Sequence, residues 1–241
     1  MGMSRGFRAA GAATVMVLCA AAAQAGSDGP NNPSFLLFAG TDLWRDGAFV
    51  DGGLLWSPAG LNTDGFTLKL LLNGGLYTYP SGGLRMDVDG TLLSAAAMPG
   101  WRTTRDGFTV DLYAGPVVQD YRLTPNDPGS RLRGLYGGAQ VAGDIWYQPS
   151  PATMIALDGS IASIYLIGSA RAAIGWRLVE PFFVGPETQA FWCTDYRELR
   201  LGAHVTGYRI DALEWSAAAG WAADSFGRGG PYLRLGVTAR Y

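Results

Sequence analysis

The chain has 241 residues and a nearly balanced charge, with 18 Lys and Arg against 20 Asp and Glu. A balanced chain without a basic patch or stripe is not a typical nucleic-acid-binding protein. One histidine and two cysteines are too few for a disulfide-rich scaffold or for a zinc site built from Cys and His ligands. We therefore expect no metal, no cofactor and no nucleic-acid partner.

The first 25 residues have the three parts of a secretory signal peptide. Arg5 and Arg8 form a basic start, residues 9–23 carry no charge, and the Ala-Gln-Ala at 23–25 is an A-x-A cleavage site. We expect residues 1–25 to be removed and residues 26–241 to form a single β-barrel domain. This domain contains no apolar stretch long enough to cross a membrane as a helix. It is therefore either a soluble β-protein or a closed barrel, because only helices and closed barrels satisfy every backbone polar group in lipid.

From Ser34 onward the sequence divides into runs in which apolar and polar side chains alternate. A period of two is the period of a β-strand, whose successive side chains point to opposite faces. Turn-forming clusters separate the runs, and an even number of runs of about ten residues is typical of transmembrane barrels. We predict an all-β fold, an antiparallel transmembrane β-barrel of about 12 strands. The runs are Phe35–Trp44, Ala48–Trp56, Phe66–Tyr77, Met86–Met98, Phe108–Tyr121, Arg133–Tyr147, Thr153–Ile164, Ile167–Leu178, Phe182–Trp192, Tyr196–Arg209, Leu213–Asp224 and Pro231–Tyr241.

Some details of this barrel stay open. The run at 86–98 and the link near Tyr165 are poorly patterned, so that about ten or about fourteen strands are also compatible with the sequence. Residues 99–107 are interpreted as a turn. Pro116 lies inside the fifth run, and we expect a bulge there because proline cannot donate a hydrogen bond to a ladder.

The last run distinguishes the barrel from a soluble β-sandwich. It alternates without a break from Tyr232 and ends on an aromatic residue of the apolar face, Tyr241, as do the terminal strands of bacterial outer-membrane barrels, which it resembles. We expect it to pair with the first run, and Tyr241 to lie at the lipid interface and to be part of the assembly signal. Aromatic residues near strand ends, where interfacial girdles lie, also favour a barrel. They are Trp44 or Trp56, Tyr147, Trp176, Trp192, Trp215, Trp221 and Tyr241.

The polar face of each run is then expected to line the lumen. Its titratable residues are of mixed sign, and buried charges persist only when they are paired. A barrel of about twelve strands falls between barrels filled by side chains and wide porins, so a filled lumen and a narrow channel for a polar or sugar-like solute both stay open. The predicted lumen-lining residues are Lys69, Asp111, Asp144, Asp158, Arg171, Arg177, Glu187, Glu198, Arg200, His204, Glu214, Arg234 and Arg240.

An enzymatic alternative depends on His204 and Thr206. The two lie on the polar face of one run and loosely resemble the His-x-Ser pair of outer-membrane lipid and phospholipid hydrolases. The position of the nucleophile holds threonine, and the sequence places no orienting carboxylate beside the histidine. We therefore expect no enzyme, and keep a barrel hydrolase acting on lipid or polysaccharide, or a soluble periplasmic β-protein, as alternatives.

Six segments carry a family resemblance over nearly all of the chain after residue 25: Phe38–Gly47, Gly52–Leu61, Gly65–Leu72, Gly115–Gly134, Pro151–Met154 and Asp195–Gly207. Together they resemble the BcsS family of cellulose biosynthesis proteins, although none is a catalytic signature. The resemblance implies an exported, envelope-associated protein linked with the cellulose synthase machinery, and it supplies no mechanism. Together with the signal peptide, the alternating runs and the aromatic placement, it favours an outer-membrane barrel that assists cellulose export or assembly by passing or holding glucan, or by anchoring envelope components. Its implied partners are outer-membrane lipid, the cellulose or glucan chain and components of the cellulose synthase.

Overall fold

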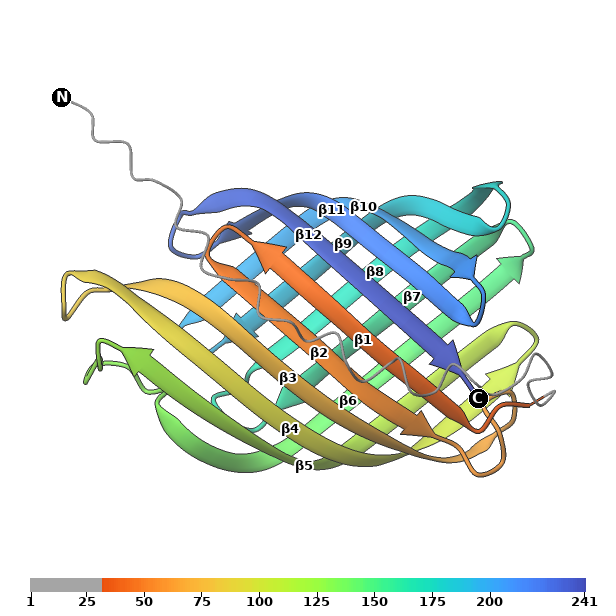
Figure 1. The fold of residues 1–241 in the computed structure, drawn as a ribbon, viewed down its shortest axis with the longest axis horizontal. Helices are drawn as coiled ribbons and strands as arrows, with labels where there is room; N and C mark the ends of the chain where they lie inside the picture. The colour runs from red at the N-terminus through yellow and green to blue at the C-terminus, as the bar shows by residue number, and fades with distance from the viewer. Residues whose placement is uncertain (1–31) are drawn as a thin grey trace.

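The computed structural model describes residues 32–241, so the predicted signal peptide at 1–25 lies outside the described residues. Twelve antiparallel strands form one closed barrel, as predicted (Figure 1). Within residues 32–241 no helix is long and apolar enough to cross a membrane. The strands are β1 (Phe35–Trp44), β2 (Gly47–Trp56), β3 (Gly65–Ser81), β4 (Met86–Arg105), β5 (Phe108–Thr124), β6 (Gly134–Ser150), β7 (Thr153–Ala162), β8 (Gly168–Val179), β9 (Phe182–Cys193), β10 (Tyr196–Ile210), β11 (Leu213–Asp224) and β12 (Gly229–Arg240).

The barrel closes where β12 pairs with β1, which confirms the predicted pairing of the last run with the first. The register runs from Leu36 opposite Arg240 to Trp44 opposite Tyr232 without a shift. Tyr241 extends the seam by one residue. Its carbonyl accepts from the Phe35 N–H at 2.8 Å, and its own N–H donates to the Phe35 carbonyl at 2.9 Å. Closure leaves no unpaired strand edge, which is the condition for a sheet to lie in lipid.

The two ends of the barrel differ. The terminal end, where β1 begins and β12 ends, carries two-residue turns at 106–107, 151–152, 180–181 and 211–212, and one longer loop at 57–64. The opposite end, named the loop end here, carries longer connections at 82–85, 125–133, 163–167 and 225–228, and two-residue turns at 45–46 and 194–195. Strands β3 to β6 have 17, 20, 17 and 17 residues and project beyond their neighbours at the loop end (Figure 1). A strand needs only about 9–11 residues to span a bilayer, so these four strands form a wall beside the mouth.

Two sequence-based expectations about β4 and β5 are wrong. Residues 99–105 continue β4, and only Asp106 and Gly107 form the turn. The expected bulge at Pro116 is absent, because the pairs Ala96–Val117 and Gly100–Tyr113 belong to one unshifted register. Between these two pairs, β4 and β5 are not paired with each other, and this gap is called the lapse here. Pro99 and Pro116 both lie in this lapse, where the sheet has no ladder hydrogen bond for a proline N–H to complete.

The two faces of the sheet have opposite character. Leu72, Leu112 and Leu201 expose 61–63% of their surface on the outer face, whereas polar residues such as Gln140 and Glu187 are buried inside. An apolar exterior around a polar interior is the arrangement of a transmembrane barrel. Among the predicted interfacial aromatics, those exposed on the outside are Tyr147, Trp176, Trp215 and Trp221.

Trp44 and Trp192 differ from these four exposed aromatics. Trp44 packs inward against a buried cluster that contains Tyr232. Trp192 is half-buried beside Gly168, its partner in the register, and is among the residues that line the internal cavity. Both residues lie at the loop-end limit of their strands, where the barrel wall forms the rim of the mouth. A side chain at this rim can contact the interior of the mouth as well as the outer surface.

Candidate functional site

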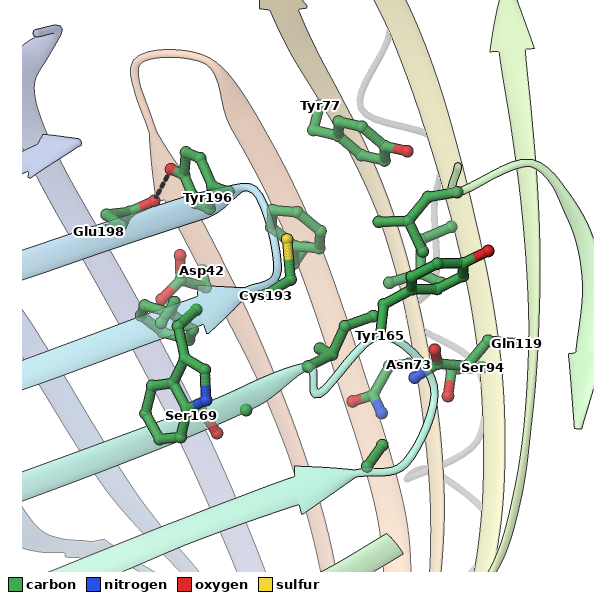
Figure 2. Close-up of a pocket in the computed structure, with 18 of the residues that line it drawn as sticks. Asp42, Asn73, Tyr77, Ser94, Gln119, Tyr165, Ser169, Cys193, Tyr196 and Glu198 are labelled. Atoms are coloured by element: carbon green, nitrogen blue, oxygen red, sulfur yellow. Dashed lines mark hydrogen bonds between the residues drawn. The ribbon is translucent and has the colours of Figure 1, made fainter. Parts of the chain in front are cut away.

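A cavity of about 910 Å³ occupies the loop-end half of the barrel. It reaches the mouth at Asp46, Gly82, Asp127 and Phe226, which belong to turns of the loop end or the strands beside them. The turns of the terminal end contribute no lining residue. Figure 2 shows part of the wall, where side chains from β1, β3, β9 and β10 converge on the same space. The cavity is therefore a cup that opens at the loop end.

Buried side chains close the barrel below this cup. Met98, Met154 and His204 are at most 1% exposed and are among the largest fully buried residues. One cluster of buried residues includes Met98 and Tyr113, and a second joins Met154 to Phe183. A water-filled pore would leave inward-facing side chains accessible, so this half of the lumen is filled.

The ion pair between Arg102 and Asp111 holds the terminal-end loop at 57–64 against the closed half of the barrel. The Arg102 guanidinium donates to both Asp111 carboxylate oxygens, at 2.7 Å and 2.6 Å, and its third bond goes to the Leu61 carbonyl at 2.8 Å. Leu61 itself is buried in the same cluster as Met98. The loop at 57–64 is thus held as a plug by a bidentate pair and by apolar burial.

The strand register aligns five of the predicted lumen charges into one row, together with Arg102 and Gln189. Each inward-facing residue of the row lies directly opposite the next on the adjacent strand, where opposite charges attract and like charges repel. From β4 to β10 the row reads Arg102, Asp111, Asp144, Asp158, Arg171, Gln189 and Arg200. Because strands tilt in a barrel, the row climbs from the closed half into the cup.

Two ion-pair networks start from this row. Arg171 donates to Asp158 at 2.7 Å and to Glu187 at 3.2 Å, and Arg234 from β12 also donates to Glu187. Lys69 on β3 donates to Asp144, the neighbour of Asp158 in the row, at 2.7 Å. The cations are therefore held by carboxylates, as buried charges require.

Arg200 is the centre of the second network. Its Nη1 donates to both carboxylate oxygens of Asp42, at 2.7 Å and 2.6 Å, and its Nε donates to Glu198. The Tyr196 hydroxyl donates to the other oxygen of Glu198 (Figure 2). The guanidinium carbon lies 4.6 Å from the centroid of the Phe191 ring, so this arginine is held by both charge and aromatic contact.

A second row, uncharged except for Asp51, lines the opposite wall. Asp51 on β2 is opposite Asn73 on β3, Asn73 is opposite Ser94 on β4, and Ser94 is opposite Gln119 on β5. All four line the cup, and Figure 2 shows Asn73, Ser94 and Gln119 beside one another. The predicted set included only titratable residues and so omitted the three uncharged ones, although alternation already placed Asn73 and Gln119 on the polar face. It also omitted two titratable residues of the cup, Asp42 and Asp51.

The predicted lumen-lining residues are in three places. Those that line the cup are Lys69, Asp144, Asp158, Arg171, Glu198, Arg200 and Arg234. Asp111, Glu187 and His204 are buried in the barrel but do not line the cup. Three others lie toward the terminal end. Arg177 is near Glu180 at 3.5 Å, Glu214 pairs with Arg209 at 3.2 Å, and Arg240 borders a separate groove that also includes Glu214.

His204 and Thr206 form a hydrogen-bonded pair away from the cup. The His204 Nδ1 and the Thr206 hydroxyl oxygen are 2.9 Å apart, and Nε2 is 3.1 Å from the Ile174 carbonyl. The carbonyl can only accept, so Nε2 carries the proton and Nδ1 accepts from the threonine hydroxyl. His204 is 1% exposed, and neither ring nitrogen bonds to a carboxylate. Neither residue lines the cup, so a substrate held there would not reach the pair.

Asp127 anchors the long loop at 125–133 over the mouth. Its carboxylate accepts from the Gly129 N–H at 2.9 Å and from the Tyr79 hydroxyl at 3.0 Å. Hydrogen bonding from the Ser81 hydroxyl, and then from these two donors, lowers the pKa of Asp127 below its ordinary value. Among residues 32–241, no group of three or more His, Cys, Asp or Glu side chains is arranged to hold a metal ion.

The comparisons with known proteins agree with this architecture. The family model described as cellulose biosynthesis protein BcsS matches residues 36–241, which covers every strand of the barrel apart from the first residue of β1. The chain belongs to the BcsS family. Membership associates this BcsS-family barrel with cellulose biosynthesis, as the sequence resemblance predicted. No curated protein matches it.

Solved structures share the barrel architecture with the BcsS-family chain at low identity. A TodX monoaromatic hydrocarbon channel mutant is 8% identical, with a TM-score of 0.50 over 88% of this chain and 90% of that one. LpxR from Salmonella typhimurium is 12% identical, with a TM-score of 0.48 over 86% and 100% of the two chains. The KdgM porin is 13% identical, with a TM-score of 0.45 over 86% and 99%. At these identities the likeness concerns the fold alone.

Proposed function

We propose that this protein is a non-enzymatic outer-membrane accessory of cellulose biosynthesis that holds glucan in its cup. The observation that carries the proposal is the asymmetry of the lumen, which is open at the loop end and filled at the terminal end. Held in the membrane by its apolar exterior, such a barrel binds a chain end without conducting it. Family membership supplies the link to cellulose.

The cup faces the cell exterior in this proposal. Outer-membrane barrels have short periplasmic turns and longer extracellular loops. Four of the five connections at the terminal end have two residues, whereas four of the six at the loop end have four or more, including the longest, 125–133. Secreted cellulose would therefore meet the open mouth, whereas the closed half would face the periplasm and any component of the synthase located there.

Two alternatives receive less support from the geometry. A channel for glucan or a small solute would need a path past Met98, Tyr113 and Met154, which are buried against their neighbours. A hydrolase would need His204 to reach a substrate, and that residue is sealed from the cup. Both alternatives are tested by the experiments below.

Deletion of the gene in its own host tests the proposal. We expect less extracellular cellulose, or cellulose less well attached to the cell, and recovery on complementation with the full-length chain. We expect the folded protein in the outer-membrane fraction and no steady conductance when it is added to planar bilayers. Unchanged cellulose after deletion would contradict the accessory role. Recovery of the folded protein in the periplasm without detergent would contradict the membrane location, and a steady ohmic current would favour the channel.

A further inference from the structure

We infer that the cup selects a neutral oligosaccharide end, bound along a polar rail formed by Asp51, Asn73, Ser94 and Gln119. The inference deepens the proposed function, on which its connection with cellulose rests.

The rail provides the hydrogen-bonding groups that a sugar requires. Amide and hydroxyl side chains both donate and accept, as do sugar hydroxyls, and a carboxylate accepts. The side chains of Asn73 and Ser94 make no hydrogen bond to another described residue, and Gln119 only accepts one, from the Tyr121 hydroxyl at 3.0 Å. Their strands are adjacent, so successive rail residues are about 4.7–4.9 Å apart. This spacing is comparable with the length of one pyranose unit, and it lets consecutive sugars meet consecutive strands.

A further buried group points to a polar ligand from the opposite wall. Gln189 lines the cup and is 3% exposed. Its Nε2 donates to Glu187 at 2.9 Å, whereas its Oε1 has no hydrogen-bond partner among the described residues. A buried acceptor without a partner costs free energy, and a donating hydroxyl in the cup would remove that cost.

Aromatic rings above the rail complete the site. Tyr77 and Tyr79 line the mouth on β3, with ring centroids 6.2 Å apart and an angle of 26° between their planes. Tyr196 lines it from β10, and Tyr165 lines it from the turn at 163–167, with its ring against Tyr136 of β6 (Figure 2). The faces of a pyranose ring are C–H surfaces that pack on aromatic rings, while its edges carry hydroxyls. Stacked rings beside a polar rail therefore suit a sugar chain better than a purely apolar ligand.

The charges of the cup favour a neutral sugar over an acidic one. The cations at mid-depth, Lys69, Arg171, Arg200 and Arg234, are each bonded to a carboxylate. Asp51, by contrast, forms no ion pair with any residue of 32–241 and lies on the rail itself. An acidic chain would have to displace one of these carboxylates or accept a like charge at Asp51.

Titration of the purified full-length protein in detergent with cellohexaose, and with an oligogalacturonate of equal length, tests the inference. We expect calorimetry to show binding of cellohexaose and at least tenfold weaker binding of the oligogalacturonate. Asn73→Ala and Gln119→Ala should each weaken cellohexaose binding about 5- to 10-fold, the cost of one or two hydrogen bonds. Gln148→Ala is the matched control, because Gln148 is on β6 and is absent from the cup lining. It should change the affinity less than twofold.

The reactivity of Cys193 reports whether the ligand binds in the cup. It is a free cysteine that lines the cup (Figure 2), so bound cellohexaose should slow its reaction with a maleimide at least fivefold. Cys193→Ser gives the background, and the heat-dependent shift of the barrel on a gel shows that each variant is folded. Binding without protection of Cys193, equal affinity for the oligogalacturonate, or equal losses in Gln119→Ala and Gln148→Ala would overturn the inference.

Failure of the inference and failure of the proposed function give different results. A barrel that binds no cellohexaose, but whose deletion still lowers cellulose, would overturn the inference alone. A barrel that binds cellohexaose, but whose deletion leaves cellulose unchanged, would overturn the proposed function alone.

Discussion

Replacement of Arg102 by alanine should open and destabilise the closed half of the barrel. Arg102 bonds both oxygens of Asp111 and the Leu61 carbonyl, and the two charged side chains are only 10% and 6% exposed. Arg102→Ala leaves the Asp111 carboxylate buried without its cation. Removal of one partner from a buried pair costs about 3–5 kcal/mol in the free energy of unfolding. The same change releases the loop at 57–64 from the wall.

The free energy of unfolding can be measured in urea with the barrel refolded into lipid vesicles and tryptophan fluorescence as the signal. Arg209→Ala is the matched control, because Arg209 pairs with Glu214 at 3.2 Å but is 67% exposed. That change should cost less than about 1 kcal/mol. The double variant Arg102→Met with Asp111→Leu should recover most of the loss, since apolar pairs often replace buried ion pairs without cost. Equal losses in Arg102→Ala and Arg209→Ala would refute the reasoning.

Three further predictions concern the seam, the mouth and the buried histidine. Deletion of Tyr241 removes two backbone hydrogen bonds to Phe35, and we expect less folded barrel in outer-membrane fractions; unaffected insertion would contradict the assembly role. Asp127 has a lowered pKa, so its stabilisation of loop 125–133 is full above about pH 4 and is lost as the pH falls through its folded value. Hydrogen exchange of that loop, corrected for intrinsic rates, should rise there, and Asp127→Asn should remove the pH dependence. His204→Ala should lower stability by about 1–3 kcal/mol and leave envelope lipid composition unchanged; altered lipid would revive the hydrolase hypothesis.

Alternation alone predicted the strands and their faces because a strand's side chains switch sides at every residue. It placed twelve runs, paired the last with the first and put Lys69, Arg171 and Arg200 on the polar face, as the structure has them. The errors were at two prolines inside β4 and β5. Pro99 was interpreted as a turn because a proline interrupts most ladders, yet it lies where β4 and β5 make no bonds.

The family resemblance was also present in the sequence, since its segments are local stretches of strand ends and turns. The match over residues 36–241 shows that these stretches belong to one family rather than to barrels in general. Cellulose biosynthesis therefore follows from the sequence, whereas the manner of participation depends on where the lumen is open.

Only the tertiary structure decided which polar-face residues share a site. The face on which a side chain lies depends on its own strand alone. Its neighbours across the sheet depend on the register between two strands, which is set by turn lengths and by the stagger needed to close the barrel. That register places Asp158 opposite Arg171 and Asn73 opposite Ser94, and it separates His204 from the cup. It also brings Leu61 and Arg102 together across the closed half, although they are 41 residues apart in the chain. The sequence determines what faces inward, and the closed sheet determines at what height each inward group lies.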